Sequence, residues 1–368
     1  MPKRRPAKKR SPAAAVLLAV LCLLLLAVSR YLDSRSEPAA SVSAPEAAQA
    51  DASGLEVHFL DIGQGDSALL FCGDETLLID GGKVKNNQKL IARLKELEVD
   101  HLDAVICSHP DEDHCGGLSA VLASTRTDAF YCSVDSWHTK VFSDVTKYVA
   151  EQGISVTIPQ AGDTFAFSDA SVEFLGPVVD YGDDPNEGSL VARVRYGETS
   201  FLFTGDMGFE AEDDMLAAGV DVSATVLKVA HHGSAGSSST EFLQAVHPQY
   251  AVISVGADND YGHPTEAALN RLSACGIPVY RTDLLGEIIA VSDGKTVTIT
   301  SASNEAPPAS DAASQTAGSY GYVGNSSSKV VHLAGCGKLP GESNRVYFAS
   351  LDEALAAGYC KHASCLGS

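Results

Sequence analysis

Basic residues are scarce in this chain relative to acidic ones. Its 368 residues include 26 Lys and Arg against 47 Asp and Glu, which gives a formal net charge of −21 at pH 7. A protein that binds nucleic acid or an anionic membrane over a broad surface needs the opposite balance. The composition therefore argues against such a surface, and any phosphate group that the chain binds must be held by local charge.

The sequence contains a single long hydrophobic run, at Ala13–Val28. Six Lys and Arg residues between Lys3 and Arg10 precede it. This pattern is typical of a signal peptide or a single membrane anchor, and the positive-inside rule places the remaining chain outside the cytoplasm. We expect this segment at 1–31 and a linker at 32–53, with membrane contact if the segment stays uncleaved. We expect no channel or translocation helices.

A cluster of imidazole and carboxylate side chains follows one apolar run. The run Asp103–Ser108 predicts a buried strand, and His109-Pro-Asp-Glu-Asp-His114 comes directly after it. Such groups are costly to hold together unless a positive charge neutralises them, and imidazole and carboxylate suit zinc, iron and manganese. The pattern predicts a metal pair on a loop, with a helix beginning near Gly116 or Gly117. A solvated acidic turn would account for the carboxylates but not for the flanking histidines.

Further candidate ligands follow other strand-like runs. Asp206 ends a short apolar run, His231 directly follows Val226–Ala230, and His263 comes several residues after a third run. Each candidate therefore follows a predicted buried strand. This placement is what a site along one edge of packed sheets requires.

Alternating strand and helix patterns from Leu55 to about Thr300 predict an α/β domain. The chain is too long for one ordinary domain, and 45% hydrophobic residues suffice for a substantial core. The expected helices are Asn87–Glu98, Gly117–Ser124, Thr139–Gln152, Phe209–Ala218, Ser239–Val246 and Thr265–Ala274. The expected strands include Glu56–Asp61, Ser67–Cys72 and Ser171–Leu175.

Seven motifs, in order, resemble the metallo-β-lactamase superfamily and, within it, the hydrolase domain of ComEC-type DNA-uptake proteins. They are Val57–Ser67, Leu77–Gly82, Ser108–Gly117, Asn186–Val191, Phe203–Asp206, Leu227–Ser234 and Gly262–Pro264. The resemblance implies a metallo-β-lactamase αββα sandwich over 54–300. Its metals would lie at the sheet edges.

The resemblance also implies that this domain binds two divalent metal ions, zinc or manganese. The candidate ligands are His109, Asp111, Asp113, His114, Asp206, His231 and His263. We expect the first two to hold one ion, the next two to hold the other, and Asp206 to bridge them. Of the last two, His231 is favoured as a direct ligand because it directly ends a strand.

Three positions depart from the usual family pattern. Asp111 occupies the place of the second histidine, a variant that the ComEC-like branch shares. Ser189 lies in the motif that often supplies a third histidine, so we expect one metal site to be short of a ligand. Thr265 stands where relatives often carry a histidine after His263.

The resemblance favours an exported phosphodiesterase or nuclease that acts on DNA or another phosphodiester. A metal-bound hydroxide would be the nucleophile, because two metals can lower the pKa of water and clamp the attacking and leaving oxygens. Asp113 or Asp111 would orient it, and His263 or Ser234 would contact the leaving oxygen or the phosphate.

Two other functions remain open. One is hydrolysis of another exported substrate, namely a wall-polymer phosphodiester, a thioester or a lactam; Asp111 in place of histidine makes the lactam the least favoured. The other is a non-catalytic binding protein on the same fold, which the retained ligands disfavour. Lys228 or Arg193 would assist the metals in binding phosphate, and no protein partner is implied.

The C-terminal part separates into a linker and a small module. Ser, Ala, Pro and Gly dominate the linker at 301–319. The module at 320–368 is too short for a stable core unless a bound metal ion or a disulfide cross-links it. The module resembles the zinc-binding domain of the Ada methyl-phosphotriester repair protein. This resemblance implies one structural zinc ion, and the implied ligands are His332, Cys336, His362 and Cys365, with Cys360 as an alternate. A disulfide among the cysteines is the competing interpretation.

We predict that residues 320–368 fold only with one zinc ion. The apolar residues of this segment are too few to offset its ordering entropy, so the free energy of zinc binding becomes folding free energy. Circular dichroism of the segment with zinc, with chelator and with reductant measures this. Structure that survives the chelator and collapses under the reductant would identify a disulfide through Cys360 instead.

Overall fold

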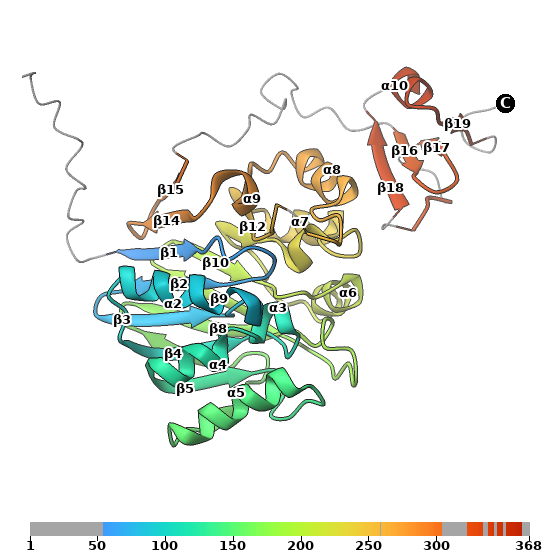
Figure 1. Ribbon diagram of the computed structural model, residues 1–368. Helices are drawn as coiled ribbons and strands as arrows, with labels where there is room; N and C mark the ends of the chain where they lie inside the picture. Colours follow the sequence, from blue (N-terminus) through green and yellow to red (C-terminus); the bar gives the residue numbers. More distant parts are fainter. Residues whose placement is uncertain are drawn as a thin grey trace, which may run out of the picture. The chain divides into compact units, whose positions relative to one another are not determined.

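A computed structural model describes most of the chain (Figure 1). The described residues are 54–257, 259–303, 322–333, 338–341, 344–348 and 351–362. The expected targeting segment at 1–31, the linker at 32–53 and most of the linker at 301–319 lie outside them, as do Cys336 and Cys365. Among the helices of the described part, none has the length and hydropathy to cross a bilayer.

Two mixed β-sheets form the body of residues 54–303. The first has the strand order β15-β14-β1-β2-β3-β4-β5-β6, and the second has the order β13-β12-β11-β10-β9-β8-β7. The strands of the first sheet are β1 (Leu55–Phe59), β2 (Ala68–Cys72), β3 (Glu75–Ile79), β4 (His101–Cys107), β5 (Arg126–Cys132), β6 (Val156–Thr157), β14 (Ile288–Ser292) and β15 (Val297–Ser301). Those of the second are β7 (Thr164–Phe167), β8 (Ala170–Gly176), β9 (Val191–Tyr196), β10 (Thr199–Phe203), β11 (Val226–Lys228), β12 (Tyr250–Ile253) and β13 (Val279–Arg281).

Helices cover the outer faces of both sheets (Figure 1). The first sheet packs against α2 (Asn87–Glu96), α4 (Leu118–Ser124) and α5 (Lys140–Glu151). The second packs against α6 (Phe209–Ala217), α7 (Thr240–Val246) and α8 (Glu266–Ala274). The short elements are η1 (Val84–Asn86), α3 (Glu112–Cys115), η2 (Ala230–Gly233) and α9 (Thr282–Leu285).

The alternation of side chains along the strands divides the core into three layers. On β2, Leu70 faces the core between the sheets, and its neighbour Leu69 packs under the helices. On β10, Phe203 lies in the core between the sheets, where its ring stacks on that of Phe59 with 5.9 Å between centroids, and Leu202 faces the opposite helices. Successive side chains of a strand point to opposite faces, so strands buried on both faces produce the predicted αββα sandwich, which is confirmed.

The expected helices are all present, within two residues of their expected bounds. Three begin after a side-chain cap that is visible in the sequence. Thr139, Ser239 and Thr265 each accept a hydrogen bond from the backbone N–H three residues on, at the starts of α5, α7 and α8. Such a cap satisfies one of the N–H groups that the first turn leaves unpaired.

The ligand-rich run differs from the sequence prediction, because it does not lie wholly on a loop. Glu112–Cys115 form the one-turn helix α3, and Asp111 precedes it with extended backbone. The next helix, α4, begins directly after Gly117, near the predicted start. Four helical residues between two loops are too few to leave a periodic apolar pattern in the sequence.

The C-terminal module contains a four-stranded sheet in the order β18-β16-β17-β19. Its elements are β16 (Tyr322–Asn325), β17 (Val330–Leu333), β18 (Arg345–Phe348), α10 (Leu351–Ala356) and β19 (Cys360–Lys361). A small core of Val331, Phe348, Ala354 and Tyr359 holds them together.

A buried carboxylate on α6 fixes the loop that leads from η2 into α7. Glu212 is fully buried and accepts hydrogen bonds from the backbone N–H groups of Ser238 and Ser239. The guanidinium of Arg271, also fully buried, donates from Nε to the Ser238 carbonyl at 2.8 Å and from Nη2 to the Ser237 carbonyl at 2.6 Å. The two side chains thus satisfy this backbone from both sides: the Glu212 oxygens accept from its N–H groups, and the Arg271 guanidinium donates to its carbonyls.

We predict that Glu212→Ala lowers the free energy of unfolding by about 3 kcal/mol, because it leaves two buried backbone N–H groups without an acceptor. Urea unfolding of the metal-free protein, followed by circular dichroism, measures the loss. Glu210→Ala is the matched control, since this exposed residue lies on the first turn of the same helix. Equal unfolding midpoints for the two variants would contradict the assigned role of Glu212.

Candidate metal centre

The candidate ligands gather where strands of both sheets end. β3 and β4 run parallel in the first sheet, and β10, β11 and β12 run parallel in the second. The carboxyl ends of parallel neighbours meet at the same edge of a sheet, as is common for sites in such folds. Asp80 follows β3, His109 follows β4, Asp206 follows β10 and His232 follows β11.

Three buried imidazoles form the middle of this group. The rings of His109 and His114 have centroids 4.1 Å apart, and those of His114 and His232 are 5.2 Å apart. In each ring the buried Nε2 atom makes no hydrogen bond of normal geometry within the described part of the chain. His114 Nε2 lies 3.0 Å from Asp206 Oδ1, and His232 Nε2 lies 3.6 Å from Asp206 Oδ2.

Partners on the opposite side of each ring hold two of these imidazoles in place. His114 Nδ1 lies 2.9 Å from Asp80 Oδ2. His232 Nδ1 lies 2.9 Å from the Ser254 carbonyl and 3.0 Å from Asp66 Oδ1. Because these partners are acceptors, each Nδ1 carries a proton, and Nε2 faces the centre. Carboxylate–histidine pairs of this kind orient the ligands of metal sites.

Two serine hydroxyls support the third imidazole. His109 Nδ1 lies 3.0 Å from Ser108 Oγ and 3.3 Å from Ser189 Oγ. Ser189 Oγ also accepts a hydrogen bond from the Asp206 backbone N–H at 3.1 Å. The residue in the motif that often supplies a third histidine therefore positions His109 and Asp206 here.

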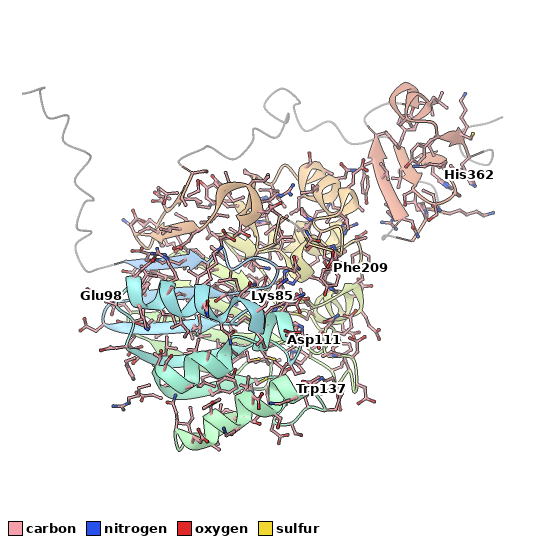
Figure 2. All side chains as sticks on the ribbon, viewed as in Figure 1. Lys85, Glu98, Asp111, Trp137, Phe209 and His362 are labelled. Atoms are coloured by element: carbon pink, nitrogen blue, oxygen red, sulfur yellow. The ribbon has the colours of Figure 1, made fainter. Side chains whose placement is uncertain are left out.

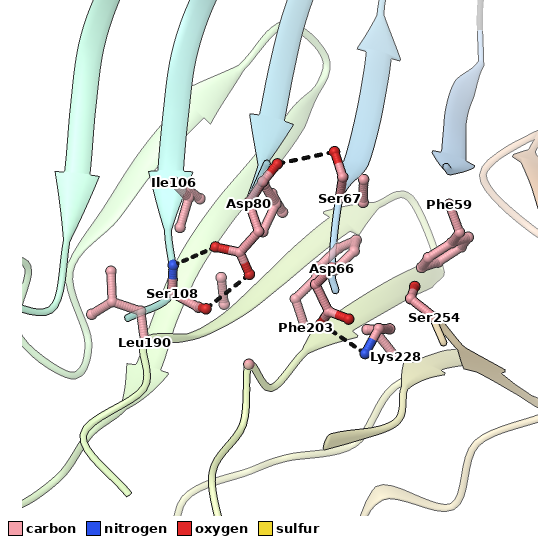
Figure 3. Close-up of a pocket in the computed structure, with 14 residues that line it drawn as sticks. Phe59, Asp66, Ser67, Asp80, Ile106, Ser108, Leu190, Phe203, Lys228 and Ser254 are labelled. Atoms are coloured by element: carbon pink, nitrogen blue, oxygen red, sulfur yellow. Dashed lines mark hydrogen bonds and ion pairs between the residues drawn. The ribbon is translucent and has the colours of Figure 1, made fainter. Parts of the chain in front are cut away.

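A buried ion pair closes the inner side of the group (Figure 3). Lys228 Nζ lies 2.7 Å from Asp66 Oδ2, and both side chains are less than a tenth exposed. Asp66, Lys228, Asp80 and Ser108 line a cavity of about 10 Å³ between the sheets, which has room for about one water molecule. A substrate must therefore approach from the outer side.

A tight backbone contact joins two of the acidic segments. The Asp66 N–H donates to the Asp113 carbonyl at 3.0 Å. Gly65 has φ +131°, and a Cβ at this position would collide with the Asp113 carbonyl oxygen. Glycine therefore lets the segment before β2 reach the ligand run.

Electrostatics show that the group needs positive charge. Burial alone would raise the pKa of Asp206, but the attraction of His114 and His232 outweighs burial and holds this pKa well below its usual range. Burial would lower the pKa of His232, yet Asp206 and Asp66 raise it to about 9. Burial, followed by repulsion from His114, lowers the pKa of His109 to about 3. Protons on imidazoles thus balance the carboxylates here, and divalent cations can replace those protons.

The remaining predicted site residues lie on the outer side of the centre. Asp113 Oδ2 lies 3.7 Å from His232 Nε2, and Asp111 Oδ2 lies 3.9 Å from His109 Nε2. His231 Nε2 lies 3.6 Å from Asp206 Oδ2, and its side chain is 31% exposed. All four carboxylate and imidazole groups that the sequence assigned to the first loop thus reach the centre together with Asp206.

Two predicted residues lie farther from the carboxylates. The His263 ring has its centroid 5.7 Å from that of His231, and its buried Nδ1 has no hydrogen-bond partner in the described structure. Burial, followed by repulsion from His232, lowers the pKa of His263 to about 4, so this ring is neutral at pH 7. Ser234 Oγ accepts a hydrogen bond from Gly236 N at 3.3 Å within its own loop. The catalytic roles of both residues stay predictions.

One potential metal-binding group at this edge includes two residues that the sequence did not single out as ligands. Single ligand atoms of Asp66, His114, Asp206 and His232 all lie within 4.8 Å of one another. We regard Asp66 as a support rather than a ligand, because its oxygens contact His232 Nδ1 and Lys228 Nζ. His232 and its neighbour His231 both have positive φ, 53° and 50°, and this backbone brings the second imidazole inward.

The prediction that Lys228 or Arg193 assists phosphate binding is wrong. Lys228 is committed to Asp66, as described above. Arg193 is buried, and its Nη2 and Nη1 atoms lie 2.7 Å from Glu173 Oε2 and 3.2 Å from Asp221 Oδ2. Ion pairs fix both buried cations, because separating either cation from its carboxylates would leave a buried charge uncompensated.

Comparisons with known proteins agree with this geometry. The family described as the metallo-beta-lactamase superfamily matches residues 60–257, over half of the chain. The chain is 34% identical to Competence protein ComA of Neisseria gonorrhoeae over 76% of its own length and 38% of that protein. It is 31% identical to ComE operon protein 3 of Bacillus subtilis (strain 168) over 63% of its own length and 32% of that protein. The chain thus spans about a third of the length of these relatives.

A solved structure is also similar. The metallo-beta-lactamase fold protein YhfI from Bacillus subtilis matches with 13% identity and a TM-score of 0.44, over 67% of this chain and 100% of that one. The family match and the curated relatives confirm the resemblance that the seven sequence motifs carry.

We predict that residues 51–300, which exclude the tail cysteines, bind two divalent ions and that Asp206→Ala leaves less than one. Asp206 faces two imidazoles, so its loss removes the carboxylate that both ions would share. His232→Ala should remove more metal than His231→Ala, because the inner imidazole is buried and held by Asp66. Elemental analysis after dialysis measures the content, with exposed His138→Ala as the control. Equal metal in all variants would disprove this assignment.

Proposed function

The chain belongs to the metallo-β-lactamase superfamily, and on that premise we propose that it is an exported metal-dependent phosphodiesterase or nuclease. Its substrate would be DNA or a related phosphodiester. The observation that carries the proposal is the set of three buried Nε2 atoms that face the centre around one shared carboxylate, Asp206. This donor set fits a pair of divalent cations, since imidazole and carboxylate are ligands of zinc and manganese.

The candidate ligands would divide between two ions. His109 and Asp111 would hold one, with His231 as the candidate to complete it, and Asp206 would be shared. The other ligands, Asp113, His114 and His232, would hold the second ion. When bound, such ions supply Lewis acidity, which lowers the pKa of a water molecule and neutralises charge on a phosphoryl oxygen.

The protein groups around the ions perform the remaining tasks. Asp80 and Asp66 hold the His114 and His232 rings so that each Nε2 faces inward. Their burial excludes bulk water from the inner side of the centre. On the outer side, His263 is a neutral ring beside His231 and can donate a hydrogen bond to a leaving oxygen.

DNA is the favoured substrate because the relatives with 34% and 31% identity carry the names Competence protein ComA and ComE operon protein 3, and competence is the uptake of DNA. Export rests on the basic and apolar segment at 1–31, which lies outside the described residues. Another phosphodiester, thioester or lactam substrate is an outcome that the experiment below can detect.

We also propose that the C-terminal module holds one structural zinc ion and contacts DNA. β17 and β19 pair in parallel, and the rings of His332 and His362 have centroids 4.0 Å apart. His332 Nδ1 is buried and has no hydrogen-bond partner within the described residues. Two adjacent imidazoles of this kind suit a metal ion, and Cys336 and Cys365 would complete the set.

We predict that the metal-loaded protein hydrolyses bis-p-nitrophenyl phosphate and that His109→Ala and Asp206→Ala lower kcat/KM by about 100-fold or more, since even the outer partners of metal ligands contribute 10- to 100-fold. Single-stranded and duplex DNA complete the panel, each with zinc and with manganese. His138→Ala should retain the full rate.

Cleavage that persists equally in the variants would identify a contaminating enzyme. Hydrolysis of a lactam or thioester with no phosphodiester cleavage would replace the proposed substrate class. Metal binding without any hydrolysis would favour a binding protein.

A further inference from the structure

A lysine and a tyrosine meet across the outer edge of the metal centre. Lys83 lies in the loop between β3 and η1, which belongs to the first sheet. Tyr261 lies in the loop between β12 and α8, which belongs to the second. Lys83 Nζ donates a hydrogen bond to the Tyr261 hydroxyl at 3.2 Å, and the two loops therefore touch beside the ligands.

This pair adjoins the centre and is accessible from the outside. Lys83 Nζ lies 3.9 Å from Asp113 Oδ2, which is longer than a hydrogen bond. The Lys83 side chain is 16% exposed, and Tyr261 is 58% exposed. The ammonium carries three donors, so donation to Tyr261 leaves others for a ligand.

The tyrosine is held by the loop that also carries His263. Asn259 Oδ1 accepts hydrogen bonds from the backbone N–H groups of Tyr261 at 3.2 Å and His263 at 2.9 Å. The Tyr261 and His263 rings stack with 5.8 Å between centroids and 15° between planes. One short loop thus places a hydroxyl and an imidazole side by side at the entrance.

Lys83 differs from the other cation of this centre. Among the described lysines and arginines, Lys83 and Lys228 lie within 4 Å of the carboxylates that surround the imidazoles. Lys228 is buried at 2.7 Å from Asp66 and faces the inner cavity. The formal net charge of −21 means that the protein as a whole repels anions. A cation at the entrance can offset this repulsion locally and attract an anionic ligand.

We propose that Lys83 and Tyr261 form an anion clamp that binds a non-bridging oxygen of the substrate phosphodiester at the entrance to the metal centre. This inference rests on the proposed function, because it assigns the residues that recognise that substrate. Both groups donate hydrogen bonds, and a charge-assisted bond from an ammonium to a phosphate oxygen is stronger than a neutral one. The pair would therefore position the phosphate beside Asp113.

The test uses the full chain loaded with metal and the variant Lys83→Met. Lys85→Met is the matched control, because Lys85 is exposed on the adjoining η1 and is labelled in Figure 2. Calorimetric titration with dimethyl phosphate measures binding without chemistry. Kinetics with bis-p-nitrophenyl phosphate and with the neutral ester p-nitrophenyl acetate separate charged from neutral substrates.

We expect Lys83→Met to weaken dimethyl phosphate binding and to raise KM for the charged diester by about tenfold, the effect of one lost hydrogen bond to a charged group. Neutral ester kinetics and metal content should stay unchanged. Tyr261→Phe should show a smaller loss of the same kind, and Lys83→Arg should restore most of the binding. Lys85→Met should behave as the unsubstituted protein.

Unchanged dimethyl phosphate binding in Lys83→Met, an equal loss in Lys85→Met, or a loss of metal from Lys83→Met would overturn the clamp. If phosphodiester cleavage is absent while dimethyl phosphate binding still depends on Lys83, the clamp stands and the proposed function fails. If cleavage is normal and Lys83→Met has no effect, the function stands and the clamp fails.

Discussion

Burial of carboxylates at the edge of the two sheets constrains the rest of the structure. Asp66, Asp80 and Asp206 are each at most 5% exposed, and a buried carboxylate without a partner costs several kcal/mol. Each one lies against an imidazole or an ammonium from a different segment of the chain, on α3, on β11 or in η2. The fold must therefore bring the ends of β2, β3, β4, β10 and β11 together, and the αββα sandwich is the arrangement that does so.

Features that depend on neighbouring residues could be predicted from the sequence. The helix bounds follow from apolar periodicity and from caps such as Thr139 and Ser239, so they agree to within two residues. The ligand-rich run was also evident, because His109 and His114 lie within six residues of each other. Asp206 was found by its place at the end of a strand.

Features that depend on distant pairing or on backbone conformation could not be predicted. The support of His114 by Asp80 needs β3 and β4 to pair in register, which no local pattern specifies. The inward position of His232 depends on two consecutive residues with positive φ, a conformation uncommon outside glycine. The ion pair between Lys228 and Asp66 joins segments that are far apart in the chain.

Two lysines lie near different carboxylates of the centre, and the depth of each one decides whether it stabilises the fold or can contact a ligand. Lys228 faces a cavity of about 10 Å³ and is the permanent partner of Asp66, so it stabilises the inner side of the centre. Lys83 stands on the opposite side, where Asp113 is too far for a hydrogen bond and Tyr261 is exposed. With the inner side closed by an ion pair, only the outer side can admit a substrate. The side from which a substrate can approach thus follows from the burial of Lys228 and the partial exposure of Lys83.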